Sequence, residues 1–515
     1  MRTYEIRNGY AVFPYGISRI EANAFCDCSE LTHVIIPDSV SEIDDHAFCR
    51  CTGLSHLVIP DGVTRIGVGA FWGCTTLTSV YIPRSVTSIN VAAFAGCANL
   101  SSIIVDINNR YYNSKNCCNA IIETNTGTLI AGCSSTLIPE ATSKIGDYAF
   151  YGCIHLSQIA IPRTVTIIGN SAFSDCKHLS HVTMTDSITR IGESAFSGCT
   201  SLRNIIVPKY LSQLSSNVFS RTGLVNVTIP NQITIIYDSA FAFCSELTNI
   251  IIPSSVREIG DYAFSSCRKL ENVVILEGVR KIGESAFSDC SNLSNISLPN
   301  SIVQISREAF RLCQKLVNFI VPAGVKTIEY GTFYGCKGLR NVIILKGVAI
   351  IETEAFFGCV GLTNVTIPNS VRKIRHRAFE GCSGLTEVII PESVVEYNYA
   401  PFMGCHGLKK IEVNENNPIY DSRKNCNAVI HTQSNTLIEG CASTKIPDGI
   451  RKIESSSFSC CNTLTSILIP NSVTEIGAVA FNNCPNLSII YVDALKKDFY
   501  ISLLPSELHD KIIAL

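Results

Sequence analysis

The sequence predicts an elongated solenoid, in which short coils of similar sequence stack and bury one shared core. Phenylalanine recurs along the 515-residue chain with a usual step of 23 residues, as at Phe25, Phe48 and Phe71. Apolar residues follow one pattern within each step. A coil of this size cannot bury its apolar side chains alone, so neighbouring coils must close the core by stacking. We expect about twenty coils at this step.

Each full coil follows the pattern L-xx-V-x-I-P-xx-V-xx-I-xxx-A-F-xx-C. In the first copy, Leu31, Val34 and Ile36 alternate as in an extended strand, and stacked copies of this strand predict a parallel sheet. Pro37 lacks a backbone N–H and ends the strand. A second segment, Val-xx-Ile, is expected to line the opposite wall, and a following glycine such as Gly67 predicts a turn with positive φ. The Ala-Phe pair fills the centre of the coil.

This pattern resembles the BspA-like class of leucine-rich repeats, whose signature is IPxxVxxIGxxAFxxCxxL. Copies in this chain include IPDSVSEIDDHAFCRCTGL, IPSSVREIGDYAFSSCRKL and IPNSVTEIGAVAFNNCPNL. The resemblance covers nearly the whole sequence and implies a leucine-rich-repeat solenoid, α/β to mainly β, that is right-handed and curved with a parallel sheet on its concave side. The chain lacks the asparagine that better-known leucine-rich repeats carry after the strand, where Ser39, Gly62 and Ser85 stand.

The repeats at 25–492 are expected to lie between two caps. Residues 1–24 predict a capping hairpin and a degenerate coil, because the pair Asn8-Gly9 favours a type I′ turn. Residues 493–515 no longer repeat and have helical spacing, with Pro505-Ser506 able to begin a last helix. They resemble the closing helix of BspA-like proteins and predict a helical cap.

Two steps between phenylalanines measure 56 residues and define enlarged coils at 100–150 and 408–458, each with 33 additional residues. The segments NAIIETNTGTLIAG and NAVIHTQSNTLIEG predict two strands around a polar turn, so we expect a projecting hairpin. Inherited architecture and a dedicated binding feature are both open readings of these insertions. Matching residues in the two insertions are Asn108, Asn109, Tyr112, Cys118, Ala120 and Gly132 in the first, and Asn416, Asn417, Tyr420, Cys426, Ala428 and Gly440 in the second.

The chain has 25 cysteines, and seventeen of them stand three residues after a phenylalanine, from Cys28 through Cys484. Equivalent side chains in adjacent coils lie about 4.8 Å apart, which is longer than the Cβ separation that a disulfide prefers. We therefore expect buried thiols that act as small apolar side chains. Zinc would need convergent pairs of ligands, which the spacing does not provide. No metal site and no cofactor are predicted.

Composition and motifs exclude several functions. The net charge of −2 and the lack of a basic tract argue against nucleic acid as a partner. No apolar run approaches the ~18 to 20 residues of a membrane-spanning helix. No nucleophile elbow, phosphate loop, dinucleotide fingerprint or HExxH motif is present, so we predict no catalytic residue and no enzyme. The start MRTYEIRNGY lacks the pattern of a secretory signal, although a removed signal would leave the same sequence.

The third and fifth positions of L-xx-V-x-I must point away from the core. The third position is asparagine in eight consecutive coils, and the fifth is often apolar. Stacked amides can satisfy one another, and β-branched residues favour strands; a long exposed apolar row instead indicates a partner. The candidate partner-binding residues are Ile35, Val58, Tyr81, Ile206, Asn249, Ile251, Asn272, Val274, Asn295, Asn318, Ile320, Asn341, Ile343 and Asn364.

These observations favour a nonenzymatic module that binds a protein or a glycan on its concave sheet. The family resemblance implies an adhesion or surface-interaction module at the cell surface or secreted. An intracellular interaction scaffold in the cytoplasm is the alternative, because the chain carries many thiols and no visible signal. The oligomeric state is open, with a monomer favoured.

Overall fold

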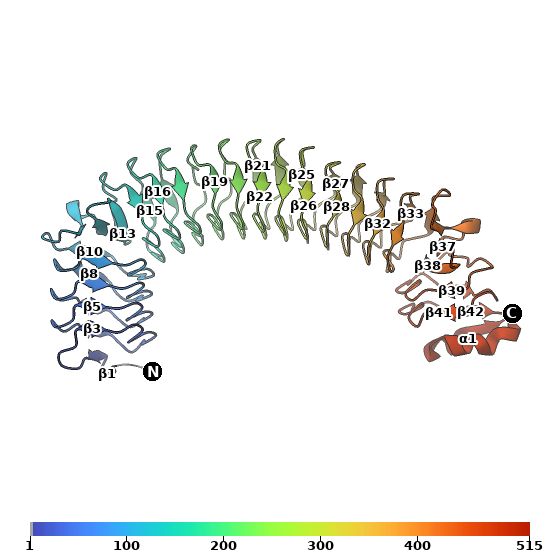
Figure 1. The fold of residues 1–515 in the computed structure, drawn as a ribbon, viewed down its shortest axis with the longest axis horizontal. Helices are drawn as coiled ribbons and strands as arrows, with labels where there is room; N and C mark the ends of the chain where they lie inside the picture. The colour runs from blue at the N-terminus through green and yellow to red at the C-terminus, as the bar shows by residue number, and fades with distance from the viewer. Residues whose placement is uncertain (1–3) are drawn as a thin grey trace. The chain divides into compact units, whose positions relative to one another are not determined.

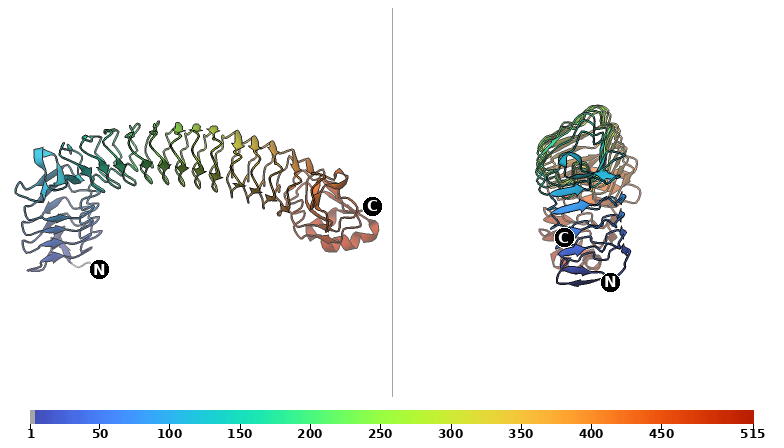
Figure 2. Two further views of the ribbon diagram at one scale, coloured as in Figure 1. Left: turned by 45° about the horizontal axis from the view of Figure 1, so that its top comes forward. Right: turned by 90° about the vertical axis from the view of Figure 1, so that its left-hand side faces the viewer.

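The computed structural model describes residues 4–515, which form a parallel β-solenoid of about 22 coils of about 23 residues (Figure 1). The chain divides into two compact units, Met1–Val256 and Arg257–Leu515. This boundary falls inside the repeat region and at neither of its predicted ends, because each coil of a solenoid contacts only its neighbours. Within each unit, equivalent strands of successive coils lie side by side (Figure 2).

Each regular coil contributes one strand to each of two walls, and these are called the first and second strands below. In the coil of Phe287, β23 (Asn272–Ile275) is the first strand and β24 (Lys281–Ile282) is the second. Both pair in parallel with the next coil, for example Asn272 with Asn295 and Lys281 with Gln304. The predicted parallel sheet is therefore confirmed.

The remaining elements follow this scheme. First strands of unit 1 are β1 (Glu5–Arg7), β2 (Tyr10–Val12), β4 (His33–Ile35), β6 (His56–Val58), β8 (Ser79–Ile82), β10 (Ser102–Val105), β15 (Gln158–Ala160), β17 (His181–Thr183) and β21 (Asn249–Ile252). Its second strands are β3 (Arg19–Ile20), β5 (Glu42–Ile43), β7 (Arg65–Ile66), β9 (Ser88–Ile89), β11 (Tyr112–Asn113), β12 (Ala120–Glu123), β13 (Thr128–Gly132), β14 (Lys144–Ile145), β16 (Ile167–Ile168), β18 (Arg190–Ile191), β19 (Gln213–Leu214) and β20 (Ile235–Ile236).

Unit 2 continues the same order. Its other first strands are β25 (Asn295–Ser297), β27 (Asn318–Val321), β29 (Asn341–Ile344), β31 (Asn364–Thr366), β33 (Glu387–Ile390), β35 (Lys410–Val413), β40 (Ser466–Leu468), β42 (Ile489–Val492) and β43 (Ile512–Ala514). Its other second strands are β22 (Glu258–Ile259), β26 (Gln304–Ile305), β28 (Thr327–Ile328), β30 (Ile350–Ile351), β32 (Lys373–Ile374), β34 (Glu396–Tyr397), β36 (Tyr420–Asp421), β37 (Ala428–His431), β38 (Thr436–Gly440), β39 (Lys452–Ile453) and β41 (Glu475–Ile476). Helical segments are η1 (Lys115–Cys117), η2 (Arg423–Asn425), η3 (Ala494–Lys496), α1 (Lys497–Leu503) and η4 (Ser506–Lys511).

The phenylalanines form the centre of the core, as predicted. The ring centroids of Phe264 and Phe287 lie 5.2 Å apart with planes 3° from parallel, and Phe287 is fully buried. The Phe287 N–H donates a hydrogen bond to the carbonyl of Ala309 in the next coil at 2.8 Å. Ring stacking and backbone bonding thus repeat together along the stack.

Of the seventeen cysteines that follow a phenylalanine, all but the half-buried Cys461 are buried, as expected, and many of them also make hydrogen bonds that the pattern did not predict. The Cys313 thiol donates to the carbonyl oxygen of Phe287 in the preceding coil at 3.2 Å, and equivalent bonds recur in other coils. In the coil that lacks the cysteine, Thr222 stands in its place, but its hydroxyl donates to the carbonyl oxygen of Phe219 in the same coil at 2.8 Å. The position therefore selects a small side chain that is also a hydrogen-bond donor.

The glycine after the second strand was expected to have a positive φ angle, and this expectation is wrong. Gly67 is not among the residues with positive φ. A Cβ at Gly67 would lie 2.5 Å from the carbonyl carbon of Asp44, so glycine is required there by the close approach of the neighbouring coil. The positive φ angles lie around the phenylalanine instead, as at Ser285 (50°) and Asp289 (59°).

The N-terminal hairpin is confirmed, with β1 antiparallel to β2 and positive φ at both Asn8 and Gly9. The helical cap is confirmed in part. Helix α1 and the short 3-10 segment η4 cover the last coil, and Tyr500 of α1 is fully buried. Ile512, which lies in the segment expected to be helical, instead begins β43, which pairs in parallel with β42.

The enlarged coils contain the two predicted strands as an antiparallel hairpin, but the expectation that this hairpin projects from the coil is wrong. β12 and β13 join the second-strand wall, with β13 parallel to β14, and Ala120, Ile121 and Ile122 of β12 are buried. β37 and β38 repeat this arrangement in the second insertion. The matching asparagines and tyrosines make equivalent bonds; for example, the Tyr112 hydroxyl accepts from the Ile89 N–H at 2.8 Å. This favours inherited architecture over a dedicated binding feature.

Candidate functional site

Within each unit, the outward positions of the first strands lie on one wall, and this surface is called the strand face below. Ile320 is 54% exposed and Ile343 is 52% exposed, as their fifth position predicts. The predicted residues lie on β4 (Ile35), β6 (Val58), β8 (Tyr81), β21 (Asn249, Ile251), β23 (Asn272, Val274), β25 (Asn295), β27 (Asn318, Ile320), β29 (Asn341, Ile343) and β31 (Asn364). Ile206 is exposed too, but it belongs to no strand.

The apolar row on this face is shorter than expected. Ile320 and Ile343 are register partners, but Ile343 faces Thr366 on its other side. Val274 likewise faces Ser297. Apolar residues therefore stand in short groups that hydroxyl side chains separate.

The asparagine row is also interrupted. The Asn295 side-chain amide donates to the Asn272 side-chain oxygen at 3.0 Å, and Asn341 donates to Asn318 at 2.9 Å. Within the described residues, no hydrogen bond joins the side chains of Asn295 and Asn318. The amides therefore hydrogen-bond to one another in pairs, and the row of these bonds is interrupted between the coils of Asn295 and Asn318.

The sheet itself ends at the same place. β25 pairs with β23, and β27 pairs with β29, but β25 and β27 belong to separate sheets. Phe319 stands at this break, and it is the one aromatic residue at an inward fourth position that in most coils carries valine, isoleucine or leucine. Its ring packs edge-on against Phe310 at 5.0 Å and Phe333 at 4.7 Å.

The phenylalanine rings are also further apart at this break than in the coils that follow it. The centroids of Phe310 and Phe333 are 5.8 Å apart, whereas those of Phe356 and Phe379 are 4.9 Å apart. A larger side chain at one inward position must displace its neighbours in a close-packed core, so we expect Phe319 to act as a wedge that widens the gap between β25 and β27. The sheet also ends between β31 and β33, where valine stands at both inward positions.

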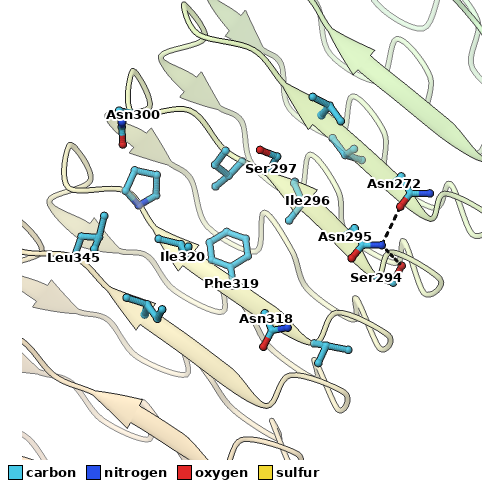
Figure 3. A pocket seen from close by; sticks show the side chains of 16 residues that line it. Asn272, Ser294, Asn295, Ile296, Ser297, Asn300, Asn318, Phe319, Ile320 and Leu345 are labelled. Carbon is cyan, nitrogen blue, oxygen red and sulfur yellow. Dashed lines mark hydrogen bonds between the residues drawn. The ribbon is translucent and has the colours of Figure 1, made fainter.

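A groove of about 940 Å³ opens at this break (Figure 3). Six of the predicted residues line it, namely Asn272, Val274, Asn295, Asn318, Ile320 and Ile343. The other eight predicted residues lie elsewhere. Sequence reasoning missed Ser297 and Phe319, which also line it. Both could have been found as departures from the pattern, one at an outward position and one at an inward position.

The groove has an uncharged lining of apolar side chains, amides and hydroxyls. Ile296 in its floor is half-buried, whereas Phe319 is only 3% exposed. Groups of this kind recognise a ligand by shape, apolar contact and hydrogen bonding. A smaller hollow of about 360 Å³ lies on the strand face of unit 1, between Leu137, Ala160 and Thr183.

A carboxylate near the strand face is hydrogen-bonded to a side chain of that face. The Tyr81 hydroxyl donates to the Asp106 carboxylate at 2.5 Å, which lowers the pKa of Asp106 and raises the pKa of Tyr81. Among residues 4–515, no cluster of three or more side chains is arranged to ligate a metal. In the same range, every helix is too short or too polar to cross a membrane.

The comparisons with known proteins agree with the repeat architecture. The model of the BspA type leucine rich repeat region matches residues 6–124, 130–248, 234–362, 326–436 and 436–499. The curated proteins yield no match.

Among solved structures, a leucine-rich repeat protein from Bacteroides ovatus is 29% identical, with 78% of this chain and 83% of that chain covered and a TM-score of 0.48. A leucine rich cell surface protein from Faecalibacterium prausnitzii is 32% identical, with 50% and 64% covered and a TM-score of 0.39. The family model covers most of the chain, and this protein therefore belongs to the BspA-type leucine-rich repeat family.

Proposed function

We propose that this protein is a nonenzymatic binding module that holds a partner protein on its strand face, with the groove between β25 and β27 as the centre of contact. The observation that carries this proposal is the groove of about 940 Å³, which opens where the sheet, the amide row and the apolar row are all interrupted. An uncharged, concave and largely apolar site with a few polar groups is what ligand sites generally offer.

We further propose that the module acts in adhesion at the cell surface, as the family resemblance implies. The alternative is an interaction scaffold in a reducing compartment. One observation favours that alternative: thiols such as Cys313 donate hydrogen bonds to phenylalanine carbonyls in many coils. Only the reduced form of cysteine can act as this donor, and thiols persist where the environment is reducing.

The test compares partner capture by the intact protein and by two groove variants, Val274→Lys and Ile320→Lys. Each variant places an ammonium in the apolar lining, and we expect capture to fall at least tenfold. Val303→Lys is the matched control, because Val303 is a valine of similar exposure (45%) outside the strand face. Equal capture by all four proteins would remove the groove from the proposal. Capture of glycans in place of proteins, lost in the same two variants, would keep the site and change the class of partner.

A further inference from the structure

The walls of the groove carry backbone groups that neighbouring coils use for pairing. The Asn295 N–H donates to the Glu271 carbonyl at 3.1 Å, and the Asn341 N–H donates to the Val317 carbonyl at 3.3 Å. At the break, the equivalent bond from the Asn318 N–H to the Ser294 carbonyl is not formed, within the part of the chain that the structure describes.

A second bond is missing on the same walls. In the last coils, the Ile469 N–H donates to the Tyr491 carbonyl at 2.9 Å. The corresponding groups here, the Leu298 N–H and the Ile320 carbonyl, have no such bond in the described residues. The two walls of the groove therefore present two backbone donors and two backbone acceptors that do not pair with each other, and open strand edges are templates for another strand.

We infer that the groove binds an extended peptide segment of the partner, which pairs with the open edges of β25 and β27 as an additional strand. This inference rests on the proposed function and specifies its partner. Main-chain hydrogen bonds supply affinity in such strand addition, while alternate side chains supply specificity. A peptide is favoured because the open groups are backbone donors and acceptors and the lining is uncharged.

The lining also limits the sequence of the peptide. Phe319 fills the core beneath the groove, so side chains of the peptide that point inward must be small, such as glycine, alanine or serine. Side chains that point outward lie near Val274, Ile320 and Ile343 and can be apolar. We therefore expect a segment that alternates small and apolar residues and carries little charge.

The experiment uses the full chain and a pool of fluorescein-labelled eight-residue peptides in which alanine or serine alternates with valine or threonine. We expect saturable binding by fluorescence anisotropy. The same peptides with alternate backbone nitrogens methylated should bind at least tenfold more weakly, because they lose donors that pair with the walls. Equal binding of the methylated peptides, or no saturable binding by the pool, would overturn strand addition.

A protein variant tests the cause of the break. Phe319→Val introduces the residue that β29 carries at the equivalent position, Val342, and removes the wedge. We expect β25 and β27 to pair and peptide binding to fall at least tenfold, while the melting temperature shows that the protein remains folded. Unchanged peptide binding by this folded variant would contradict the inference. If the lysine variants lose the partner protein but the peptides do not bind, the proposed function stands and strand addition falls.

Discussion

The Tyr397 hydroxyl donates a hydrogen bond to the carboxylate of Glu439, and both side chains are buried, Glu439 in the second enlarged coil and Tyr397 in the coil before it. The other oxygen of Glu439 accepts from the Phe402 N–H at 2.9 Å. At the first insertion, the equivalent residues are Ile89, in the coil before the enlarged one, and Ala131 within it. The backbone N–H groups of Ile89 and Tyr397 establish the match, because they donate to matching tyrosine hydroxyls. One of two sister insertions has thus exchanged an apolar pair for a buried polar one.

This pair should make the stability of the protein depend on pH. Burial raises the pKa of Glu439 to about 7, against the opposing effect of its two hydrogen bonds. In the unfolded chain the pKa of a glutamate is about 4.3. Because the folded-state pKa is the higher one, the stabilising contribution is complete below pH ~4.3 and is lost as the pH rises toward 7. The expected loss is on the order of 3 kcal/mol.

The double variant Tyr397→Ile, Glu439→Ala supplies the matched control, because it copies the pair found in the first insertion. Urea titrations from pH 4 to pH 8 should show that the free energy of unfolding falls more steeply in the natural protein than in the double variant. Glu439→Ala alone leaves the buried Tyr397 hydroxyl without its acceptor and should cost about 1 to 3 kcal/mol. Parallel pH profiles in the natural protein and the double variant would show that Glu439 does not titrate in this range.

The phenylalanine core predicts a large penalty for removing one ring. Phe287→Ala should lower the free energy of unfolding by about 3 to 5 kcal/mol, because the ring is fully buried between Phe264 and Phe310. Urea unfolding measures this loss, and Val303→Ala, at an exposed valine outside the core, should change stability by less than about 0.5 kcal/mol. Similar effects of the two substitutions would contradict the assignment of the core.

The sequence predicts the parts of this fold that depend on one coil and its immediate neighbours. The period of the phenylalanines and the alternation in each strand correctly place Phe287 inside and Ile320 outside. The cap turn at Asn8-Gly9 follows from local backbone preferences and is also correct. These features depend on residue type and spacing alone.

The break in the sheet could not be predicted in the same way. A pattern that accepts any apolar residue treats Phe319 as equivalent to Val342, although their volumes differ enough to separate two strands. The role of Gly67 was missed for a related reason, because the close approach of the Asp44 backbone belongs to a neighbouring coil. The placement of β12 within the wall likewise depends on pairing with strands distant in sequence.

Each enlarged coil has a glycine, Gly132 or Gly440, at the position where other coils carry phenylalanine, and we expect only glycine to fit there. A Cβ at Gly132 would lie 2.1 Å from the ring of Phe150, and one at Gly440 would lie 2.3 Å from the ring of Phe458. Gly132→Ala should destabilise the protein by about 3 kcal/mol, the upper end of the usual range for overpacking. Phe150→Leu in the same chain should recover part of this loss, since it removes atoms from the clash. Additive losses in thermal unfolding would show that the two sites are not coupled.

The cysteines differ sharply in expected reactivity, because the thiolate is the reactive form. Burial raises the pKa of Cys244 to about 11 and raises the pKa of Cys199 further. Cys117, in the first enlarged coil, is exposed. Iodoacetamide at pH 7.5 should therefore modify Cys117 first in the folded protein and leave Cys199 and Cys244 unmodified until the chain unfolds.

Peptide mass spectrometry after brief alkylation measures this order, and Cys117→Ser should remove the earliest adduct without changing the melting temperature. Chemical denaturation before alkylation provides the reference in which Cys199 and Cys244 react freely. If Cys199 reacted in the folded protein as fast as Cys117, its coil would have to open readily. The hydrogen bond from the Cys199 thiol to the Phe173 carbonyl, 3.2 Å long, would then contribute little to holding adjacent coils together.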